Sequence, residues 1–212
     1  MRELEIAGSG GSLKVYVDSD EYKVRYESYN TSIIELKEPS PTRNLSIAID
    51  TSKSPTCDIV IKGKTVTMSG PADRVWTGIV VYISGYDLIL KDGVGICLAP
   101  ARGEGEYVTH TLYNKSYIDY ISFGQPFKVD FILHDNARLN VSEKSRNQPI
   151  TIYAYNEAYC GIVHSSGIEV YAYDNTTIDV YDNEHKLKVN AYDNSKILAV
   201  DPTKLDINDE RN

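Results

Sequence analysis

Residues 168–199 read IEVYAYDNTTIDVYDNEHKLKVNAYDNSKILA, and within this stretch a four-residue group occurs three times. The group is Ala-Tyr-Asp-Asn at 172–175 and 191–194, and Val-Tyr-Asp-Asn at 180–183. Each copy ends a short run in which apolar residues alternate with polar ones, which is the period of a β-strand with one buried face. Repetition of a strand followed by a turn predicts a stack of similar units, so we expect a β-solenoid.

The Asp-Asn pairs predict the corners at which the chain bends between strands. Both side chains can hydrogen-bond the local backbone, and Asn tolerates a positive φ. The residues expected at corners are Asp135, Asn136, Asn156, Asp174, Asn175, Asp182, Asn183, Asp193 and Asn194. Carboxylates one layer apart could instead hold Ca²⁺, but the glycine-rich nonapeptide of calcium-binding β-rolls is absent. We therefore assign these residues to turns and expect no metal.

A longer period of about 20 residues extends the repeat toward the N-terminus. Positions that precede equivalent turns can be placed 18 to 22 residues apart, at Ser9, Tyr29, Asp50, Ser69, Lys91, Tyr113, His134, Tyr155, Tyr173 and Tyr192. The pattern is clearest over residues 129–200. It predicts an all-β, single-stranded parallel β-helix of about ten coils over residues 1–200, right-handed as parallel crossovers nearly always are. Residues 201–212 are charged and contain Pro202, so we expect a cap or tail that protects the end of the stack.

Tyrosine is the commonest aromatic residue, with 17 Tyr against 3 Phe and 1 Trp. If Ile152 and Ala154 point inward, the alternation places a set of tyrosines outside or at corners: Tyr153, Tyr155, Tyr171, Tyr173, Tyr181 and Tyr192. Tyr155, Tyr173 and Tyr192 would then stack about one layer apart. Such a ladder could bind a sugar or a protein, because Tyr combines apolar area with a polar tip. Alternatively, the rings only stabilise the solenoid by stacking on each other.

The net charge is −8 and the sequence has no basic run, which argues against nucleic-acid binding because that requires a positive surface. The three cysteines, Cys57, Cys97 and Cys160, form no Cys-x-x-Cys pair, and we expect them to be buried as small apolar residues. The sequence shows neither a signal peptide nor an apolar run of membrane-spanning length. We therefore expect no membrane partner, no cofactor, and a location in a cytosol or in a particle assembled in one.

Candidate catalytic groups do not form a motif. The four histidines, His110, His134, His164 and His185, have no partners at fixed spacing. The Gly-Ser-Gly-Gly stretch at 8–11 reads as a turn rather than a phosphate-binding loop or a nucleophile elbow. β-Helices that cleave polysaccharides carry paired carboxylates on one outer face. Asp119 and Asp130 form one such pair by alternation, but so do many others, and we expect no catalytic residue and no enzyme.

The Ala-Tyr-Asp-Asn units resemble the short A-Y-D-N-S-x-V-x repeats of many phage, prophage and gut-bacterial proteins, over roughly residues 129–200. Asn156-Glu157 and Asp182-Asn183-Glu184 depart from that consensus. The resemblance implies a β-solenoid of phage or mobile-element origin and carries over no active site. We expect a non-enzymatic structural or adhesive module whose partner is a protein, either a second copy or a virion component. The alternatives are a host-directed binding or inhibitor protein with an acidic surface, and a carbohydrate-active β-helix.

Overall fold

The computed structural model describes residues 2–8, 11–18, 22–28, 31–37, 42–50, 57–70, 78–100, 107–122, 128–143, 149–163, 167–181 and 187–211. Within these ranges the chain consists of β-strands, their turns and one short 3-10 helix, η2 (Pro202–Lys204). In this part of the chain no helix is long and apolar enough to cross a bilayer. The prediction of an all-β protein is confirmed.

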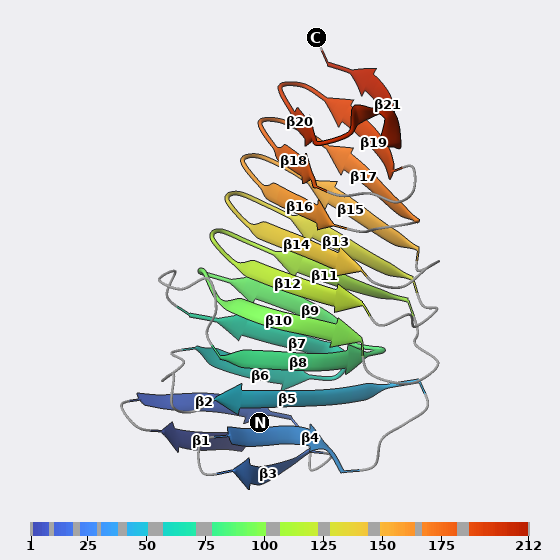
Figure 1. Ribbon diagram of the computed structural model, residues 1–212. Coiled ribbons are helices and arrows are strands. Elements are labelled where there is room, and N and C mark those ends of the chain that lie inside the picture. Colours follow the sequence, from blue (N-terminus) through green and yellow to red (C-terminus); the bar gives the residue numbers. More distant parts are fainter. Residues whose placement is uncertain are drawn as a thin grey trace.

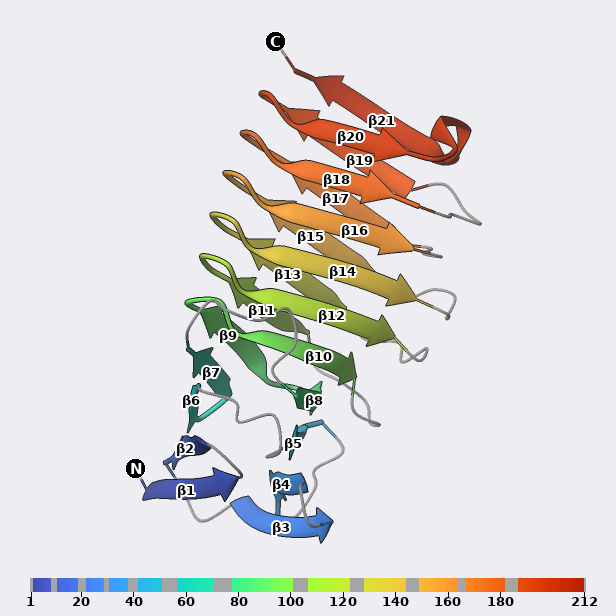
Figure 2. The same cartoon turned by 60° about the vertical axis from the view of Figure 1, so that its left-hand side comes forward.

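The strands form two sheets that face each other across one core (Figures 1 and 2). In spatial order, the eleven-stranded sheet contains β1 (Arg2–Gly8), β2 (Gly11–Val17), β6 (Asp58–Lys62), β7 (Thr65–Ser69), β9 (Asp87–Lys91), β11 (Val108–Leu112), β13 (Val129–Leu133), β15 (Ile150–Ala154), β17 (Ile168–Ala172), β19 (Leu187–Tyr192) and β21 (Leu205–Glu210). The ten-stranded sheet contains β3 (Tyr22–Ser28), β4 (Thr31–Leu36), β5 (Asn44–Asp50), β8 (Ile79–Ser84), β10 (Gly95–Pro100), β12 (Tyr117–Ser122), β14 (Arg138–Glu143), β16 (Tyr159–Val163), β18 (Thr177–Val180) and β20 (Lys196–Ala199).

From β9 onward each coil contributes one strand to each sheet, and each strand pairs in parallel with the equivalent strand of the next coil. The hydrogen-bond ladder continues through the corners, since the Tyr173 N–H donates to the Ala154 carbonyl at 2.9 Å. The predicted β-solenoid is therefore confirmed. It makes about five turns, which rise in Figure 1 from the green strands to the red ones.

The prediction of about ten coils is wrong, because much of the first third of the chain runs back and forth instead of winding. β1 pairs antiparallel with β2, β6 with β7, and β3, β4, β5 and β8 with one another in sequence. Asp50 ends β5, and Ser69 ends β7, which lies antiparallel to β6; Ser9 and Tyr29 lie outside the described residues. A two-residue connection, such as Gly63-Lys64, brings the next strand back beside the previous one and so makes a hairpin rather than a coil.

Alternation along the strands fills the space between the sheets with apolar side chains. In β15, for example, Ile150, Ile152 and Ala154 are buried while Thr151 and Tyr153 are partly exposed on the outer face. Equivalent inward residues stack into columns through the coils, one of which comprises Leu88, His110, Phe131, Ile152, Val170 and Val189. This burial supplies the main stabilisation of the fold. Since the inward side chains are shielded from solvent, a partner can contact only the outer faces, the corners and the two ends.

The C-terminal end of the stack carries charges where an apolar column would otherwise continue. β21 pairs in parallel with β19, which puts Asp209 in register with the buried Ala191. The Arg211 guanidinium pairs with the Asp209 carboxylate, and it also donates to the Ser195 carbonyl at 3.1 Å. This pairing lowers the pKa of Asp209 to about 2. Residues 205–210 of the predicted cap thus extend the sheet, and their charges discourage further strand pairing.

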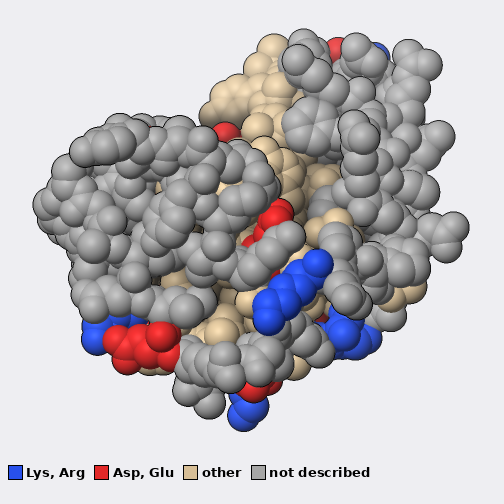
Figure 3. Space-filling view, turned by 90° about the horizontal axis from the view of Figure 1, so that it is seen from below, with Lys and Arg blue, Asp and Glu red and all other residues tan. Residues whose placement is uncertain are grey.

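At the opposite end, side chains of both signs lie beside one another. Seen from below, the coloured atoms of the described residues show red and blue groups in contact or close together (Figure 3). At this end of the stack, the Lys14 ammonium on β2 pairs with the Glu3 carboxylate on β1 at 3.0 Å. Among the described residues visible in this view, basic side chains therefore do not gather into the continuous positive surface that nucleic-acid binding requires.

Candidate functional site

From β9 onward, the corners that lead from the eleven-stranded sheet to the ten-stranded sheet share one backbone geometry. In each four-residue turn the second residue has a φ between 54° and 63°. The turn is closed by a hydrogen bond from the fourth N–H to the first carbonyl, as from Ala137 to His134 at 3.1 Å. Asp and Asn suit the second position because they adopt left-handed φ values at lower cost than most residues. They fill it at each of these corners in the described part of the chain: Asp92, Asn114, Asp135, Asn156, Asp174 and Asp193.

The structure places most of the predicted corner residues in these turns. The second positions hold Asp135, Asn156, Asp174 and Asp193, and the third positions hold Asn136, Asn175 and Asn194. Asp182 and Asn183 lie outside the described residues. The sequence interpretation missed Asp92 and Asn114 as members of this set, although the spacing of about 20 residues had already placed Lys91 and Tyr113 immediately before them.

Carboxylates at the corners also link one coil to the next. The Asp174 carboxylate accepts from the Asn156 N–H at 2.8 Å, and the Asp193 carboxylate accepts from the Asp174 N–H at 3.1 Å. Asp135 receives the Asn114 N–H in the same way at 3.1 Å. The side chain therefore satisfies a backbone donor of the coil below that the turn directs away from the strand ladder. This geometry accounts for the acidic corners without a metal ion.

Substitutions at Asp174 should separate the contribution of its left-handed φ from that of the hydrogen bond that its carboxylate accepts from the Asn156 N–H. We expect Asp174→Ala to lower the free energy of unfolding by about 2 kcal/mol, because alanine is strained at a left-handed φ and lacks the hydrogen-bond acceptor. Asp174→Gly keeps the φ and should cost only about 1 kcal/mol. Urea denaturation measures both. A rise in Tm on adding Ca²⁺ that Asp174→Asn abolishes would instead identify the corner carboxylates as metal ligands.

A column of stacked aromatic rings runs along the corners, on the side of the eleven-stranded sheet. Neighbouring rings have centroids 4.8–5.3 Å apart and planes inclined by 5–13°. This corner aromatic column consists of Tyr113, His134, Tyr155, Tyr173 and Tyr192. Tyr155, Tyr173 and Tyr192 stack as the sequence suggests, while Tyr113 and His134 extend the column downward.

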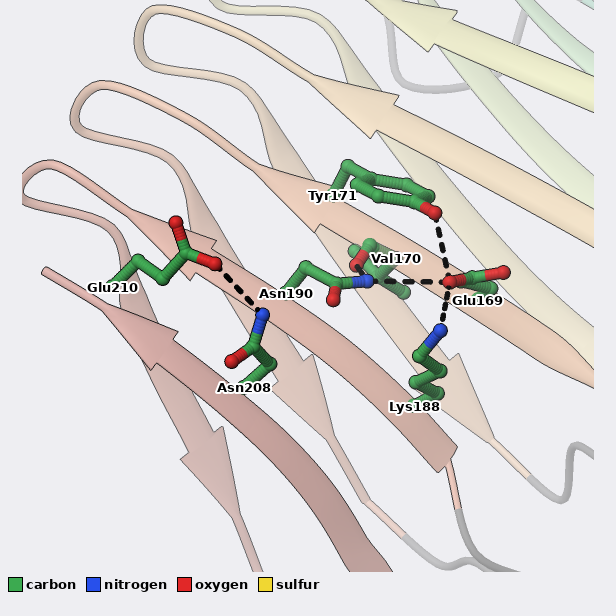
Figure 4. Close-up of polar contacts among 7 residues, drawn as sticks. All are labelled: Glu169, Val170, Tyr171, Lys188, Asn190, Asn208 and Glu210. Carbon is green, nitrogen blue, oxygen red and sulfur yellow. Dashed lines mark hydrogen bonds and ion pairs between the residues drawn. The ribbon is translucent and has the colours of Figure 1, made fainter.

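A second, shorter stack lies two residues away on the same outer face. The rings of Tyr153 and Tyr171 are 5.1 Å apart and nearly parallel. The Tyr171 hydroxyl donates to the Glu169 carboxylate at 2.8 Å, and Lys188 binds the same oxygen at 2.6 Å (Figure 4). The bond to Lys188 is the main cause that lowers the pKa of Glu169, and the bond to Glu169 raises the pKa of Tyr171 to about 12. Both groups therefore keep their ordinary charges near neutral pH.

Stacking determines what the corner aromatic column can contact. The faces of its inner rings are covered by their neighbours above and below, so only ring edges and polar tips point outward. A sugar that stacks on an aromatic ring needs a free ring face, whereas a protein surface can pack against edges and hydroxyl groups. Within the inner part of the column, the geometry therefore suits a protein contact better than a stacked sugar.

Tyr181 lies apart from the other tyrosines of the proposed ladder. It follows β18 of the ten-stranded sheet, is 46% exposed, and shares a hydrogen bond of 2.9 Å with the hydroxyl of Tyr159. The Tyr159 hydroxyl also donates to Asp179 at 3.1 Å, and burial together with these bonds raises its pKa. The structure thus brings Tyr153, Tyr155, Tyr171, Tyr173 and Tyr192 to one face and puts Tyr181 on the opposite one.

The candidate carboxylate pair is not brought together. Asp119 lies on β12 of the ten-stranded sheet and Asp130 on β13 of the eleven-stranded sheet, and both alternate with core residues. They therefore face opposite sides of the solenoid and cannot flank one glycosidic bond. The three cysteines are free; Cys57 and Cys160 are buried as expected, whereas Cys97 is only partly buried. Desolvation raises the pKa of each thiol, so none is an activated nucleophile.

Comparison with known proteins adds no relative to this description. No protein-family model matches the chain, and neither the curated proteins nor the solved structures contain a significant match.

Proposed function

We propose that this chain is a non-enzymatic β-solenoid module, encoded by a phage or prophage, that forms a structural or adhesive part of a particle. The A-Y-D-N-S-x-V-x resemblance over residues 129–200 supports the origin. A right-handed winding is part of the proposal, because parallel crossovers strongly favour that hand. The chain acts through its outer surface, and its partner is a protein of the particle or a second copy of the chain.

The observation that carries this proposal is the corner aromatic column. Its members are half-buried, so their edges lie along one border of the sheet at the regular spacing of the coils. A partner that lies along this border contacts one aromatic ring per coil and so gains several similar contacts at a regular spacing. Tyrosine is well suited to such contacts because it offers large area with few rotatable bonds.

A host-directed binding protein is the second candidate, and the exposed carboxylates beside the column favour it. Asp135, Glu157, Asp174 and Asp193 follow one another along the corners and are all exposed. A basic protein surface would be attracted to this row, and the attraction would weaken as salt is added. The two candidates differ in where the chain is found, inside the particle or free in the infected cell.

Particles purified from cells that express the chain with its neighbouring genes provide the test. We expect mass spectrometry to find the chain in the particles at high copy number. The double variant Tyr155→Ser/Tyr173→Ser should be lost from them, while Tyr181→Ser, which alters an exposed tyrosine on the other sheet, should remain.

Circular dichroism and Tm establish that both variants are folded before particles are compared. Early expression combined with absence from particles contradicts the proposal. Capture of a basic host protein that is lost on reversing the charges of Asp174 and Asp193 would support the host-directed candidate instead.

A further inference from the structure

Asp130 is a carboxylate on the outer face that is nevertheless almost fully buried. It is 7% exposed, and it alternates with the core residues Val129 and Phe131 on β13. Its Oδ2 accepts a hydrogen bond of 2.5 Å from the Tyr107 hydroxyl. Its Oδ1 has no hydrogen-bond partner. A buried acceptor left without a partner costs stability, so the position calls for a reason beyond folding.

Two of the side chains that contact Asp130 are themselves more than half exposed. The Tyr107 ring is 55% exposed, and the Lys128 side chain is 53% exposed. The Lys128 ammonium lies 5.1 Å from the centre of the Tyr107 ring and 3.9 Å from Asp130 Oδ1, which is beyond hydrogen-bonding distance. The hydrogen-bonding capacity of Oδ1 is therefore unused, although two exposed side chains lie beside it.

The neighbours of Asp130 along the outer face are hydroxyl groups. Thr109 on β11 and Thr151 on β15 are its partners in register, and both are partly exposed. Lys128 balances the charge of Asp130, so an added cation would be repelled by the ammonium about as strongly as it is attracted by the carboxylate. A neutral hydroxyl, by contrast, finds an acceptor in Asp130 and a donor in Lys128.

Tyr107 has the exposed ring surface that the inner rings of the corner aromatic column lack. It is not a member of either stack, since its only ring contact among the described residues is with the Lys128 ammonium. More than half of its surface is open, which leaves ring area for the apolar C–H side of a sugar. An exposed aromatic ring beside hydrogen-bonding groups matches the two faces of a pyranose, one apolar and one bearing hydroxyls.

We propose that Tyr107, Lys128 and Asp130 form a saccharide-binding subsite on the outer face of the eleven-stranded sheet. The sugar ring packs on Tyr107, one of its hydroxyls donates to Asp130 Oδ1, and another accepts from Lys128. The subsite goes beyond the proposed particle function and lies apart from the corner aromatic column. The proposal is limited to binding, and the residues in register beside Asp130 are the hydroxyl-bearing Thr109 and Thr151.

A glycan microarray that carries bacterial O-antigen and capsule fragments, together with plain gluco- and galacto-oligosaccharides, is the first probe. We expect the purified full chain to retain at least one of these glycans. The free oligosaccharide is then titrated by NMR against the wild type, Tyr107→Ala and Asp130→Asn. Each substitution should weaken binding by about tenfold or more, the expected loss when one charged hydrogen bond or one stacking contact is removed.

Tyr181→Ala is the matched control, since Tyr181 is similarly exposed but lies on the other sheet, and it should leave the affinity unchanged. Asp130→Asn should leave Tm nearly unchanged, because the amide oxygen can still accept the hydrogen bond from Tyr107 and the long ion pair with the exposed Lys128 contributes little. An array without a bound glycan, or glycan binding that survives both Tyr107→Ala and Asp130→Asn, overturns the subsite. Binding of Arg-rich peptides that is lost in Asp130→Asn would also overturn the saccharide subsite. These measurements use the isolated chain, so they can fail while the particle test succeeds, and the reverse.

Discussion

Replacing Phe131 with alanine should lower the free energy of unfolding by about 3–5 kcal/mol, the usual cost of removing a buried aromatic ring. Phe131 is fully buried in the middle of the solenoid. Its ring lies 5.1 Å from Tyr120, which reaches it from the ten-stranded sheet in an edge-on arrangement, and 5.4 Å from His110 in the coil below. Alanine leaves a cavity at a point where two sheets and two coils meet, and neither backbone ladder can shift to fill it.

Urea denaturation of the full chain measures this loss, with two variants for comparison. Ile132→Ala alters the next residue of β13, which points to the outer face and is partly exposed, so it should cost about 1 kcal/mol. Phe131→Leu retains most of the volume and should fall between the two. Equal losses for Phe131→Ala and Ile132→Ala would show that the inward column does not hold the sheets together. Each coil contacts only its neighbours, so a two-step transition in Phe131→Ala is also expected.

The sequence repeat predicted the solenoid correctly in the part of the chain where local sequence determines both the buried face of each strand and the backbone of each corner. Alternation in stretches such as Ile150–Ala154 specifies which face is buried, and Asp or Asn at the second corner position permits the left-handed φ. Both requirements recur in each coil, so the spacing could be traced back as far as Lys91. The order of the corner aromatic column followed from that spacing.

The same alternation does not say whether neighbouring strands are parallel or antiparallel, and this is why ten coils were expected. β5 alternates like the solenoid strands, yet it pairs antiparallel with both β4 and β8. Pairing depends on how the connections bend and on which sheet receives the next strand. For the same reason the alternation placed Tyr181 outside but could not assign it to a sheet.

The Tyr107–Lys128–Asp130 cluster could not be predicted because it depends on contacts between coils. Tyr107 precedes β11, while Lys128 and Asp130 belong to the next coil, and sequence spacing alone does not show that a tyrosine will cover this carboxylate. Sequence alternation identified Asp130 as an outward carboxylate. Its burial and its unpartnered oxygen are properties of the assembled sheet.

Lowering the pH from 7 to 4 should destabilise the wild type by about 3 kcal/mol through His110 alone. His110 is 1% exposed, stacks in the inward column between Leu88 and Phe131, and has an Nδ1 without a hydrogen-bond partner. Burial lowers its pKa from 6.5 to about 4. The unfolded chain therefore binds a proton at His110 below pH 6.5, whereas the folded chain binds it only at about pH 4 and below. Stability is fully present above pH 6.5 and is lost progressively as the pH falls through this window.

His110→Leu removes the titrating group while keeping an apolar side chain of similar size in the column. At pH 7 its stability should lie within about 1 kcal/mol of the wild type, because the gain from deleting an unpartnered nitrogen offsets imperfect packing. At pH 4 it should exceed the wild type by about 3 kcal/mol more than at pH 7. Urea denaturation at half-unit pH intervals measures the difference. Carboxylates with lowered pKa, such as Glu169 and Asp209, lose their contribution mainly below pH 4.5 and are common to both proteins. A difference between the two proteins that stays constant from pH 7 to pH 4 would mean that His110 is protonated as easily in the folded chain as in the unfolded one, which its burial forbids.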